Sequence, residues 1–349
     1  MADLIVPVAR IESVAPHPNA DRLEIATILG WQCIVGKGNW KPGQRCTYVP
    51  PDALVPLSWA DEWGVKDYLH SCATEGYGRV KSIKLRGEPS FGFAIPSVRY
   101  KHIGTNVADF FDIKKYEPSP AKGYGGKNGS APGVPVHPLL QGYTNIENFR
   151  NYPNVIQPGE MVVITEKIHG ANSRVAMLEG ELVVGSHKRQ WGRPENDSDV
   201  AENWFWYPTT IPGVMDLLAA YGRDHKQVIL YGETYGRVQS LHYGNPTGLS
   251  WAAFDLLIDG KYVNAERFAE DCRAFSVPMV PCLAIAPFHA EHMKATTVGA
   301  THLNDAHIKE GVVIKPVIER HDSKIGRVIL KYLSDDYLTS KHRDEEVAA

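Results

Sequence analysis

Residues 161–172 read MVVITEKIHGAN and place a lysine at the end of a strand-like apolar run. Residues 161–164 have the composition of a buried β-strand, which Thr165 and Glu166 continue as far as Lys167. The residues that follow, His-Gly-Ala-Asn, are small or polar and are typical of a turn. A lysine in this position is ordinarily a solvated loop residue, so its meaning depends on the rest of the chain.

The bulk composition bounds the class of protein. The chain has 349 residues, of which 43% are hydrophobic and 22% charged, and its formal net charge is −3. This length favours two domains, and the composition is that of a soluble globular protein. Because no apolar run could span a membrane and the first ten residues do not resemble a signal peptide, we expect a cytoplasmic protein without a membrane partner. We also expect a monomer. A nucleic-acid partner would require local basic patches.

Cysteines and histidines give no sign of a metal or disulfide framework. The five cysteines include no Cys-x-x-Cys pair, which favours reduced thiols. The fourteen histidines show no zinc spacing. His289 and His292 could share a helix face, for which a solvated face is the better interpretation.

The pattern along the chain predicts an α+β protein of two domains joined by a linker. Residues 1–117 contain short strand-like runs separated by Gly and Pro, which predicts a small β-barrel. Residues 118–138, rich in Pro, Gly, Ser and Lys, predict a flexible linker without a P-loop motif. In residues 139–349 strand-like runs alternate with helical stretches, chiefly 211–221 and 265–275, which predicts antiparallel sheets with helices.

Polar residues follow or interrupt the strand-like runs of the second domain. In chain order they are Lys167, Lys188, Arg189, Glu233, Glu310, Lys315 and Lys331, and the aromatic Phe254 lies inside the run SWAAFDLL. This order suits nucleotidyl transfer, in which a neutral lysine amine attacks the α-phosphorus of ATP and expels pyrophosphate.

Nucleotidyl transfer requires surroundings that keep the lysine amine neutral. The ordinary pKa of a lysine is about 10.4, so burial or nearby cations must lower it. Lys315, Lys331 or a bound metal could supply that charge. Glu310 is a suitable ligand for Mg²⁺ or Mn²⁺, Glu233 could bind ribose hydroxyls, and Phe254 could stack on adenine.

The same motifs resemble the covalent nucleotidyltransferase superfamily. They are KIHGAN at 167–172, YGE at 231–233, EGVVIKP at 310–316 and the strand that ends at Lys331. KIHGAN is similar to the double-strand RNA ligase branch, since DNA ligases and capping enzymes usually carry aspartate where this chain has His169. The resemblance covers roughly residues 140–340.

The resemblance implies an ATP-dependent RNA ligase. Such an enzyme joins 3′-hydroxyl and 5′-phosphate ends through a lysine–AMP intermediate and a 5′-adenylylated strand, at nicks in RNA-containing duplexes during RNA repair. It implies Lys167 as the nucleophile and Glu310 as the ligand of Mg²⁺ or Mn²⁺. Asn172, Lys188 and Arg189 are implied to contact the RNA end. The implied nucleotide contacts are Glu166, Ile168, Asn172, Arg189, Glu233, Phe254, Lys315 and Lys331.

One departure concerns the last motif, which in the family often reads Lys-x-Lys. Ile329 stands at the first lysine position, and only Lys331 remains. Arg327 or Lys324 could compensate for the missing charge.

The front of the chain resembles an oligonucleotide-binding (OB) fold at residues 17–36. The run 79–86, RVKSIKLR, would place Arg79 and Lys81 on one strand face and Lys84 and Arg86 on the other. Lys81 and Lys84 are therefore candidate contacts to RNA phosphates, although an ordinary solvated strand edge fits equally well.

The order of the domains resembles that of Deinococcus-type RNA ligases, because the OB-like module comes first. DNA ligases usually carry their barrel after the catalytic domain. Here the chain ends at Ala349, shortly after Lys331, and we expect no barrel there.

Each candidate residue also has a structural interpretation. Glu233 could be a salt-bridged strand end, Phe254 could belong to a core, and Lys188 with Arg189 could form a solvated hairpin. Lys315 and Lys331 could be surface strand ends. The chain could also be another covalent nucleotidyltransferase, either a DNA ligase or a GTP-using capping enzyme, or a non-catalytic RNA-binding protein.

Overall fold

The computed structural model describes residues 4–116, 133–303 and 307–340. The chain forms two compact units: unit 1 comprises Met1–Glu117 with Glu147–Pro153, and unit 2 comprises Pro118–Ile146 with Asn154–Ala349. Most of the predicted linker, residues 118–132, lies outside the described residues. Unit 1 also takes in a second segment, residues 147–153, from beyond that linker.

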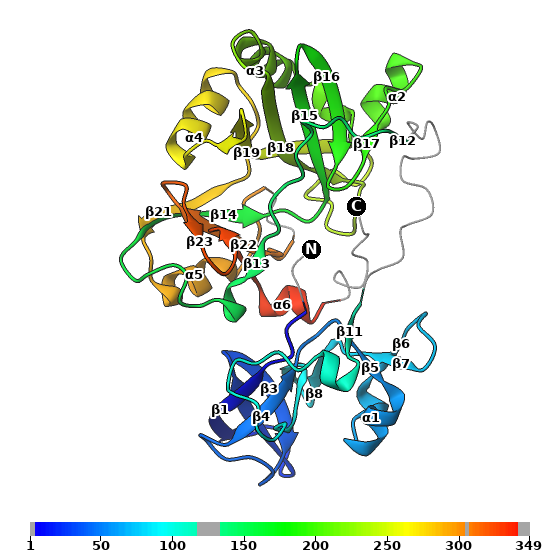
Figure 1. The fold of residues 1–349 in the computed structure, drawn as a ribbon, viewed down its shortest axis with the longest axis vertical. Helices are drawn as coiled ribbons and strands as arrows, with labels where there is room; N and C mark the ends of the chain where they lie inside the picture. Colours follow the sequence, from blue (N-terminus) through cyan, green and yellow to red (C-terminus); the bar gives the residue numbers. More distant parts are fainter. Residues whose placement is uncertain (1–3, 117–132, 304–306, 341–349) are drawn as a thin grey trace. The chain divides into compact units, whose positions relative to one another are not determined.

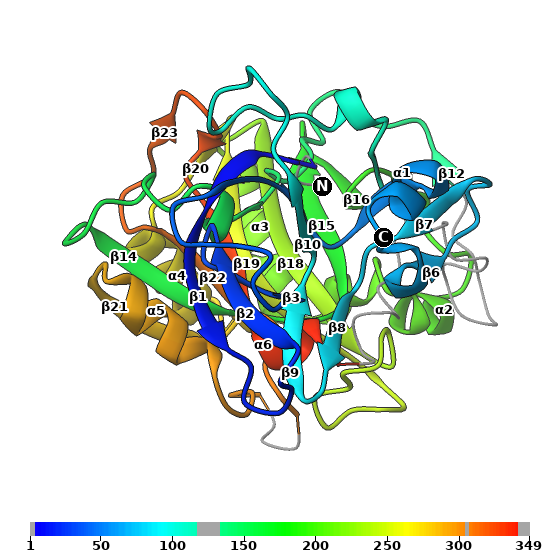
Figure 2. The same ribbon diagram turned by 90° about the horizontal axis from the view of Figure 1, so that it is seen from below.

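Unit 1 is built mainly from short antiparallel strands (Figures 1 and 2). Its main sheet is curled and runs in the order β10-β4-β1-β2-β3. The strands are β1 (Val8–Pro16), β2 (Leu23–Ile28), β3 (Trp31–Gly36), β4 (Arg45–Val49) and β10 (Phe93–Pro96). Between β2 and β3 the chain turns through Leu29 and Gly30, both with positive φ (51° and 71°), as a two-residue hairpin of matching twist requires.

The rest of unit 1 forms a second small sheet, a hairpin and short helices. The small sheet runs in the order β11-β5-β7-β6 and the hairpin joins β8 to β9. These strands are β5 (Ala53–Pro56), β6 (His70–Ser71), β7 (Tyr77–Arg79), β8 (Ser82–Leu85), β9 (Glu88–Phe91) and β11 (Lys114–Lys115). The remaining elements are α1 (Leu57–Glu62), η1 (Lys66–Tyr68), η2 (Asp109–Phe111), β13 (Glu147–Asn148) and η3 (Phe149–Asn151).

The prediction of one continuous strand over residues 79–86 is wrong. β7 ends at Arg79 and pairs with β5 and β6, whereas β8 begins at Ser82 and pairs with β9. The chain changes sheets where the buried Val80 exchanges backbone hydrogen bonds with Asp52 and Ala53. The predicted alternation of cations on two faces of one strand therefore does not apply.

The segment 147–153 packs within unit 1 through Arg150. The Arg150 guanidinium lies 3.9 Å from the centre of the Trp31 ring, and the residue is only 8% exposed. The Asn148 side chain accepts a hydrogen bond from the Arg150 amide and so begins η3.

Unit 2 contains two antiparallel sheets. The larger runs in the order β12-β17-β16-β15-β18-β19-β20. The smaller runs in the order β25-β22-β14-β21 within this unit, beside a hairpin of β23 and β24. The strands of the larger sheet are β12 (Gly133–Val134), β15 (Ala171–Leu178), β16 (Glu181–Ser186), β17 (Gln190–Trp191), β18 (Gln227–Gly236), β19 (Leu249–Ile258) and β20 (Lys261–Tyr262). The others are β14 (Met161–Lys167), β21 (Cys282–Pro287), β22 (Gly311–Pro316), β23 (His321–Asp322), β24 (Gly326–Arg327) and β25 (Leu330–Leu333).

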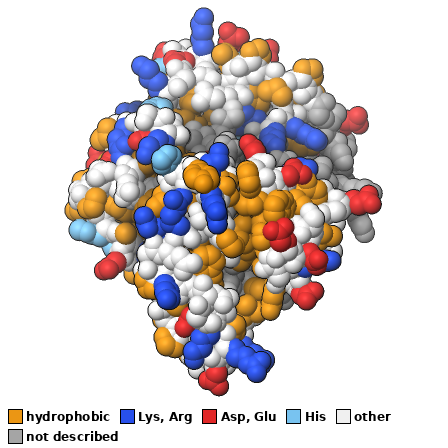
Figure 3. Space-filling model, turned by 60° about the horizontal axis from the view of Figure 1, so that its bottom comes forward, with side chains coloured by type: hydrophobic (Ala, Val, Ile, Leu, Met, Phe, Trp, Pro, Cys, Tyr) orange, Lys and Arg blue, Asp and Glu red, His pale blue; other side chains and the backbone are white. Residues whose placement is uncertain are grey.

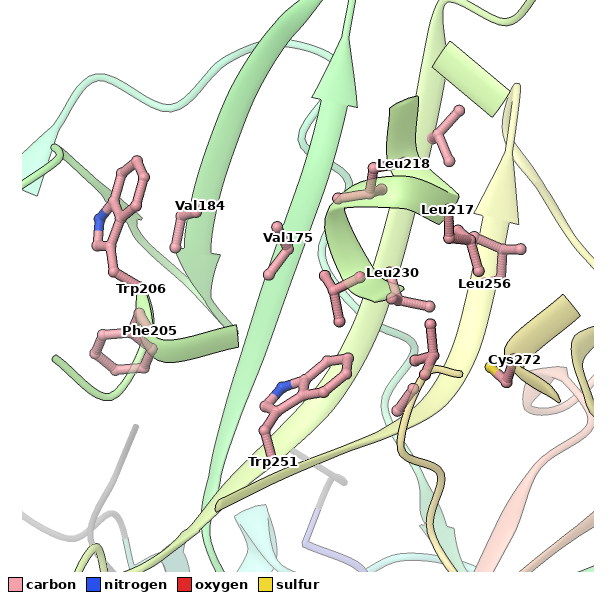
Figure 4. Close-up of a cluster of buried hydrophobic side chains, with 14 of the residues drawn as sticks. Val175, Val184, Phe205, Trp206, Leu217, Leu218, Leu230, Trp251, Leu256 and Cys272 are labelled. Atoms are coloured by element: carbon pink, nitrogen blue, oxygen red, sulfur yellow. The ribbon is translucent and has the colours of Figure 1, made fainter. Parts of the chain in front are cut away.

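Both faces of the larger sheet are buried. On one face Val175 belongs to a cluster that includes Leu217 and Leu218 of helix α3 (Pro212–Gly222), as Figure 4 shows. The next residue, Ala176, belongs to a different cluster that includes Ile329 from the chain leading into β25. Strands covered on both faces read as continuous apolar runs, which is why the sequence reveals them clearly.

The other helices of unit 2 are short. They are α2 (Asp197–Glu202), η4 (Tyr207–Thr210), α4 (Ala265–Ala274), α5 (Ala290–Thr297) and α6 (Asp335–Leu338). The mixed α+β class predicted from the sequence is confirmed. All five cysteines are free thiols. In the described ranges, no helix has both the length and the apolarity that a membrane crossing needs.

Candidate active site

Lys167 and Glu310 meet where two neighbouring strands of the smaller sheet end and begin. β14 ends at Lys167, which is the cross-strand partner of Gly311, the first residue of β22. Lys167 Nζ lies 2.5 Å from Glu310 Oε1, and the two side chains are 25% and 1% exposed. The Lys167 side chain therefore contacts the buried Glu310 carboxylate and does not point into bulk solvent.

The Glu310 carboxyl is ionised in these surroundings. Burial alone would raise its pKa, but the Lys167 ammonium and His169 together outweigh burial, and the net pKa lies below its ordinary value. The sequence predicted cations beside the Lys167 amine, whereas the structure places the Glu310 carboxylate in contact with it. This contact favours the protonated form of the amine.

The turn after Lys167 needs a glycine because another strand passes very close to it. A Cβ atom added to Gly170 would lie 2.2 Å from the Thr234 carbonyl oxygen of β18. β15 begins at the next residue, and its register makes Asn172 the cross-strand partner of Glu233. The turn at Gly170 and the strand that follows it therefore place Asn172 beside Glu233. The buried Asn172 Oδ1 atom has no hydrogen-bond donor among the described residues.

Glu233 is held partly neutral near physiological pH. Burial raises the pKa of its carboxyl to about 8, with a further upward contribution from the Glu310 carboxylate and a downward one from Lys167. A protonated carboxyl can donate a hydrogen bond as well as accept one. This property suits a residue that faces sugar hydroxyls.

The raised pKa predicts a pH-dependent contribution of Glu233 to stability. The unfolded carboxyl loses its proton near pH 4.5 and the folded one near pH 8, so stability from this group is complete below pH 4.5 and is lost as the pH rises to 8. Relative to Glu233→Gln, the wild type should therefore be less stable at pH 9 than at pH 5. Denaturant unfolding of both proteins at the two pH values measures this difference, and a difference that does not vary with pH would contradict it.

Lys331 lies on the same sheet face as Lys167. It is the cross-strand partner of Val313, which in turn pairs with Thr165. Since alternate residues of a strand share a face, Thr165, Lys167 and Lys331 project to one side. Phe254, on β19, is half-buried and meets the Tyr143 ring edge-on, with centroids 4.8 Å apart.

Lys315 occupies a buried ionic network instead of a surface strand end. Its Nζ lies 2.8 Å from Asp255 Oδ1 and 3.4 Å from Glu319 Oε1, and the side chain is 8% exposed. Arg327 Nη2 lies 2.6 Å from both Asp255 Oδ2 and Glu319 Oε1. Two carboxylates thus balance two cations in this network. Arg327, which was a candidate to compensate for the lysine missing at position 329, pairs with both carboxylates instead.

Asp255 is the residue of this network that sequence reasoning missed. It is fully buried, and the Tyr143 hydroxyl donates to it at 2.7 Å. Burial raises its pKa, but Lys315 and Arg327 more than offset this, so the net pKa lies below its ordinary value. An aspartate inside the apolar run SWAAFDLL was the available signal, because an isolated buried carboxylate requires buried cations.

The remaining predicted residues have different settings. Glu166 is buried and accepts hydrogen bonds from the Thr301 hydroxyl and from the His302 amide, the latter at 2.8 Å. Ile168 is buried in an apolar cluster with Tyr243 and Tyr337. Lys188 and Arg189 are exposed in the hairpin between β16 and β17. In unit 1, Lys84 is exposed and Lys81 is half-buried.

Comparison with known families identifies both parts of the chain. A sequence model of the RNA ligase family matches residues 160–333, and a model of an OB-fold domain matches residues 5–97. This chain carries an RNA ligase domain. The predicted OB-like front domain is likewise confirmed by its match. The RNA ligase match ends at Leu333 of β25 and includes every predicted site residue from Glu166 to Lys331.

Solved structures show the same fold over nearly the whole chain. A Naegleria gruberi RNA ligase variant, with lysine changed to methionine and crystallised with AMP and Mn, is 22% identical with a TM-score of 0.76, covering 98% of this chain and 99% of its own. The same ligase with pyrophosphate is 22% identical with a TM-score of 0.76, covering 99% and 100%. A search of curated protein sequences gives no match.

The RNA ligase domain is braced by a helix beyond the last family motif. Tyr337 of α6 is fully buried, and its hydroxyl lies 3.2 Å from His169 Nδ1. Ser334, which begins α6, donates its amide to the Glu310 carbonyl at 2.9 Å and its hydroxyl to the Lys309 carbonyl at 2.8 Å. One short helix therefore contacts both His169 and the backbone of Glu310.

We expect Tyr337→Phe to slow self-adenylylation of the RNA ligase domain. Losing the hydroxyl releases the His169 ring, which lies 3.6 Å from Glu310 Oε2. If Lys167 is the nucleophile, a misplaced ring beside its partner Glu310 should lower the rate about tenfold with an unchanged KM for ATP. Single-turnover AMP transfer measures this effect. Tyr231→Phe is the matched control, since its buried hydroxyl bonds the Gln141 carbonyl instead. Equal slowing of both variants would argue against a positioning role.

Proposed function

We propose that this protein is an ATP-dependent RNA ligase that acts through a covalent Lys167–AMP intermediate. The observation that carries the proposal is the ion pair between Lys167 and the buried Glu310, which lies inside the segment that matches the RNA ligase family. In this proposal the OB-like domain spans residues 1–117, the linker 118–138 and the ligase domain 139–349.

The reaction proceeds in three displacements at phosphorus. The Lys167 amine attacks the α-phosphorus of ATP, a P–N bond forms, and pyrophosphate leaves with the electrons of the broken P–O bond. AMP then passes to the 5′-phosphate of an RNA strand. Finally a 3′-hydroxyl attacks that phosphate, the strands are joined and AMP leaves.

Different side chains position the nucleotide and stabilise the charge on its phosphates. Glu233 binds the ribose hydroxyls, Phe254 stacks on the adenine, and Asn172 contacts the phosphates beside Lys167. Lys331, on the same sheet face as Lys167, stabilises negative charge as it develops on the phosphates. Lys315 lies in the buried network with Asp255 and would contact phosphate from there.

Glu310 is the residue best suited to a divalent metal. It is buried, ionised and close to the nucleophile, as a hard-cation ligand should be. Among the described residues no three His, Cys, Asp or Glu side chains gather as a metal site, so phosphate oxygens and water would complete the coordination of Mg²⁺ or Mn²⁺. When bound, the metal would offset the charge of Glu310 and so help to release the Lys167 amine as a nucleophile.

The substrate we propose is a nick in an RNA-containing duplex, with RNA repair as the role. The KIHGAN wording and the OB-like domain in front of the ligase domain support this choice and the Deinococcus-type branch. The solved relatives crystallised with ATP or AMP and Mn support the nucleotide and metal.

Covalent labelling tests the proposal directly. The purified protein is incubated with α-labelled ATP, α-labelled GTP or adenylate-labelled NAD and separated under denaturing conditions. We expect label from ATP alone, a mass increase of one adenylate, and its removal by pyrophosphate. Transfer from GTP would indicate a capping-type enzyme instead, transfer from NAD would indicate a different ligase class, and no transfer from any donor would overturn the proposal.

A further inference from the structure

Unit 1 has a surface where basic side chains gather without carboxylates. Residues 37–51 and 89–108 contain lysines and arginines but no aspartate or glutamate, in a chain of net charge −3. Pairing of β4 with β10 brings the two segments together. We call it the Tyr100 surface and define it by its exposed residues Arg10, Lys41, Arg45, Arg99, Tyr100 and Lys101.

Two arginines of this surface lie directly opposite each other. Arg10 on β1 and Arg45 on β4 are cross-strand partners, and like charges in this relation destabilise a sheet. Arg10 donates to the Gly43 carbonyl at 2.8 Å, and Arg45 donates to the Lys101 carbonyl, which ties the two segments together. In the described part of unit 1 neither guanidinium pairs with a carboxylate. A bound anion would relieve the repulsion, and each guanidinium has donors left for one.

The nearest carboxylate on β1 does not neutralise this pair. Glu12 instead accepts a hydrogen bond from the Gly30 amide at the β2–β3 turn, at 3.3 Å. The surface therefore keeps its positive charge, and phosphate groups are the anions that arginine binds best in a planar, two-pronged manner.

Tyr100 adds an aromatic ring to this charged setting. The residue is 95% exposed and lies between the exposed Arg99 and Lys101. Its φ of 65° is uncommon for a residue other than glycine. An exposed ring flanked by cations is the arrangement that stacks on unpaired bases while the cations hold the phosphates.

Other parts of unit 1 are less suited to phosphate. Strands β2 and β3 carry a single charged residue, Glu24, whose side chain accepts from the Gly38 amide at 2.9 Å. The run 79–86 lies against the turn that holds Asp21, because Asn19 donates to the Arg86 carbonyl at 3.0 Å. On the face shown in Figure 3, basic and acidic side chains both occur among uncharged and hydrophobic ones.

We propose that the Tyr100 surface binds an unpaired stretch of the substrate RNA that extends beyond the nicked duplex. Tyr100 stacks on one base, and Arg10 and Arg45 bind neighbouring phosphates. This contact is independent of base sequence, and the identity of its partner as substrate RNA rests on the proposed function. Lys81 and Lys84 stay proposed as further contacts of the OB-like domain to RNA phosphates.

RNA binding by surface variants of the full-length protein tests this proposal. Binding of a fluorescent single-stranded RNA lacking a 5′-phosphate is followed by anisotropy at several salt concentrations. We expect Tyr100→Gly to weaken binding about tenfold through lost stacking, whereas Tyr100→Trp keeps it. The double variant Arg10→Ala/Arg45→Ala should reduce the slope of log K against log salt by about 0.7 for each lost phosphate contact.

Matched controls separate RNA contact from a structural role. Tyr68→Ala removes a tyrosine of unit 1 that is 56% exposed but lies beside Asp67, and it should bind RNA as the wild type does. Glycine favours the positive φ of residue 100, so Tyr100→Gly should not lower the unfolding midpoint. Unchanged RNA affinity of the Tyr100→Gly and double-arginine variants, or an equal loss in Tyr68→Ala, would overturn the proposal.

The proposed function is assayed separately, by AMP transfer from ATP without RNA. We expect every surface variant to adenylylate itself at the wild-type rate. If the wild type takes up no AMP, the ligase proposal fails, yet the RNA-binding comparison still decides whether the Tyr100 surface binds RNA. If AMP uptake is normal and binding is unaltered by the variants, only the surface proposal fails.

Discussion

Lys167→Ala should abolish transfer of AMP from ATP to the protein. In the proposed mechanism the side chain supplies the attacking nitrogen, and no neighbouring group can take its place, because Glu310 is an ionised carboxylate and His169 is buried behind it. Removal of a nucleophile typically lowers the rate by at least about a thousandfold. The measurement is incorporation of labelled AMP into the protein.

The same variant should still seal a nick that already carries AMP on its 5′-phosphate. The last displacement uses the 3′-hydroxyl as nucleophile and needs no lysine amine. Retained sealing of this substrate also shows that the variant is folded, which matters because the substitution leaves the buried Glu310 without its ammonium partner. AMP incorporation by Lys167→Ala would place the nucleophile elsewhere and remove the basis of the proposed function.

Asp255→Asn should cause the largest loss of stability among substitutions near the site. Asp255 is fully buried between Lys315 and Arg327, whose nitrogens lie 2.8 and 2.6 Å from its two oxygens. The amide removes one negative charge and leaves two cations to share Glu319. Breaking a buried ion pair in this manner typically costs about 3–5 kcal/mol.

Chemical denaturation followed by tryptophan fluorescence measures this loss. Asp259→Asn is the matched control, because Asp259 is the residue directly after β19 and its pair with His225 lies on the surface. We expect no measurable change for the control. If Asp255→Asn unfolds at the same denaturant concentration as the wild type, the network does not stabilise unit 2.

A second consequence separates the two variants. Asp255 neighbours Phe254, so loosening the network should also weaken ATP binding, measured as a higher KM for ATP in self-adenylylation. Lys167→Ala, by contrast, should bind ATP while failing to react with it. The pair of variants therefore distinguishes the proposed chemical role of Lys167 from the structural role of the charges beside Phe254.

Several features could be predicted from the sequence because they depend on local order along the chain. Alternating and continuous apolar runs predicted most strands of unit 2, since both faces of its larger sheet are covered. The polar residues between those runs gave Lys167, Glu233 and Glu310, which the structure brings together. The Pro-Gly-rich stretch 118–138 and the short strands before it predicted a separate front domain.

Other features depend on which strands lie side by side, and the sequence alone could not decide this. Register alone sets Asn172 beside Glu233 and Arg10 opposite Arg45, from strands far apart in the chain. Burial alone turns Lys315 toward Asp255, because a charge removed from water needs a partner wherever the fold provides one. The sequence thus determined the kinds of groups that the site contains, and tertiary packing decided which of them pair with each other.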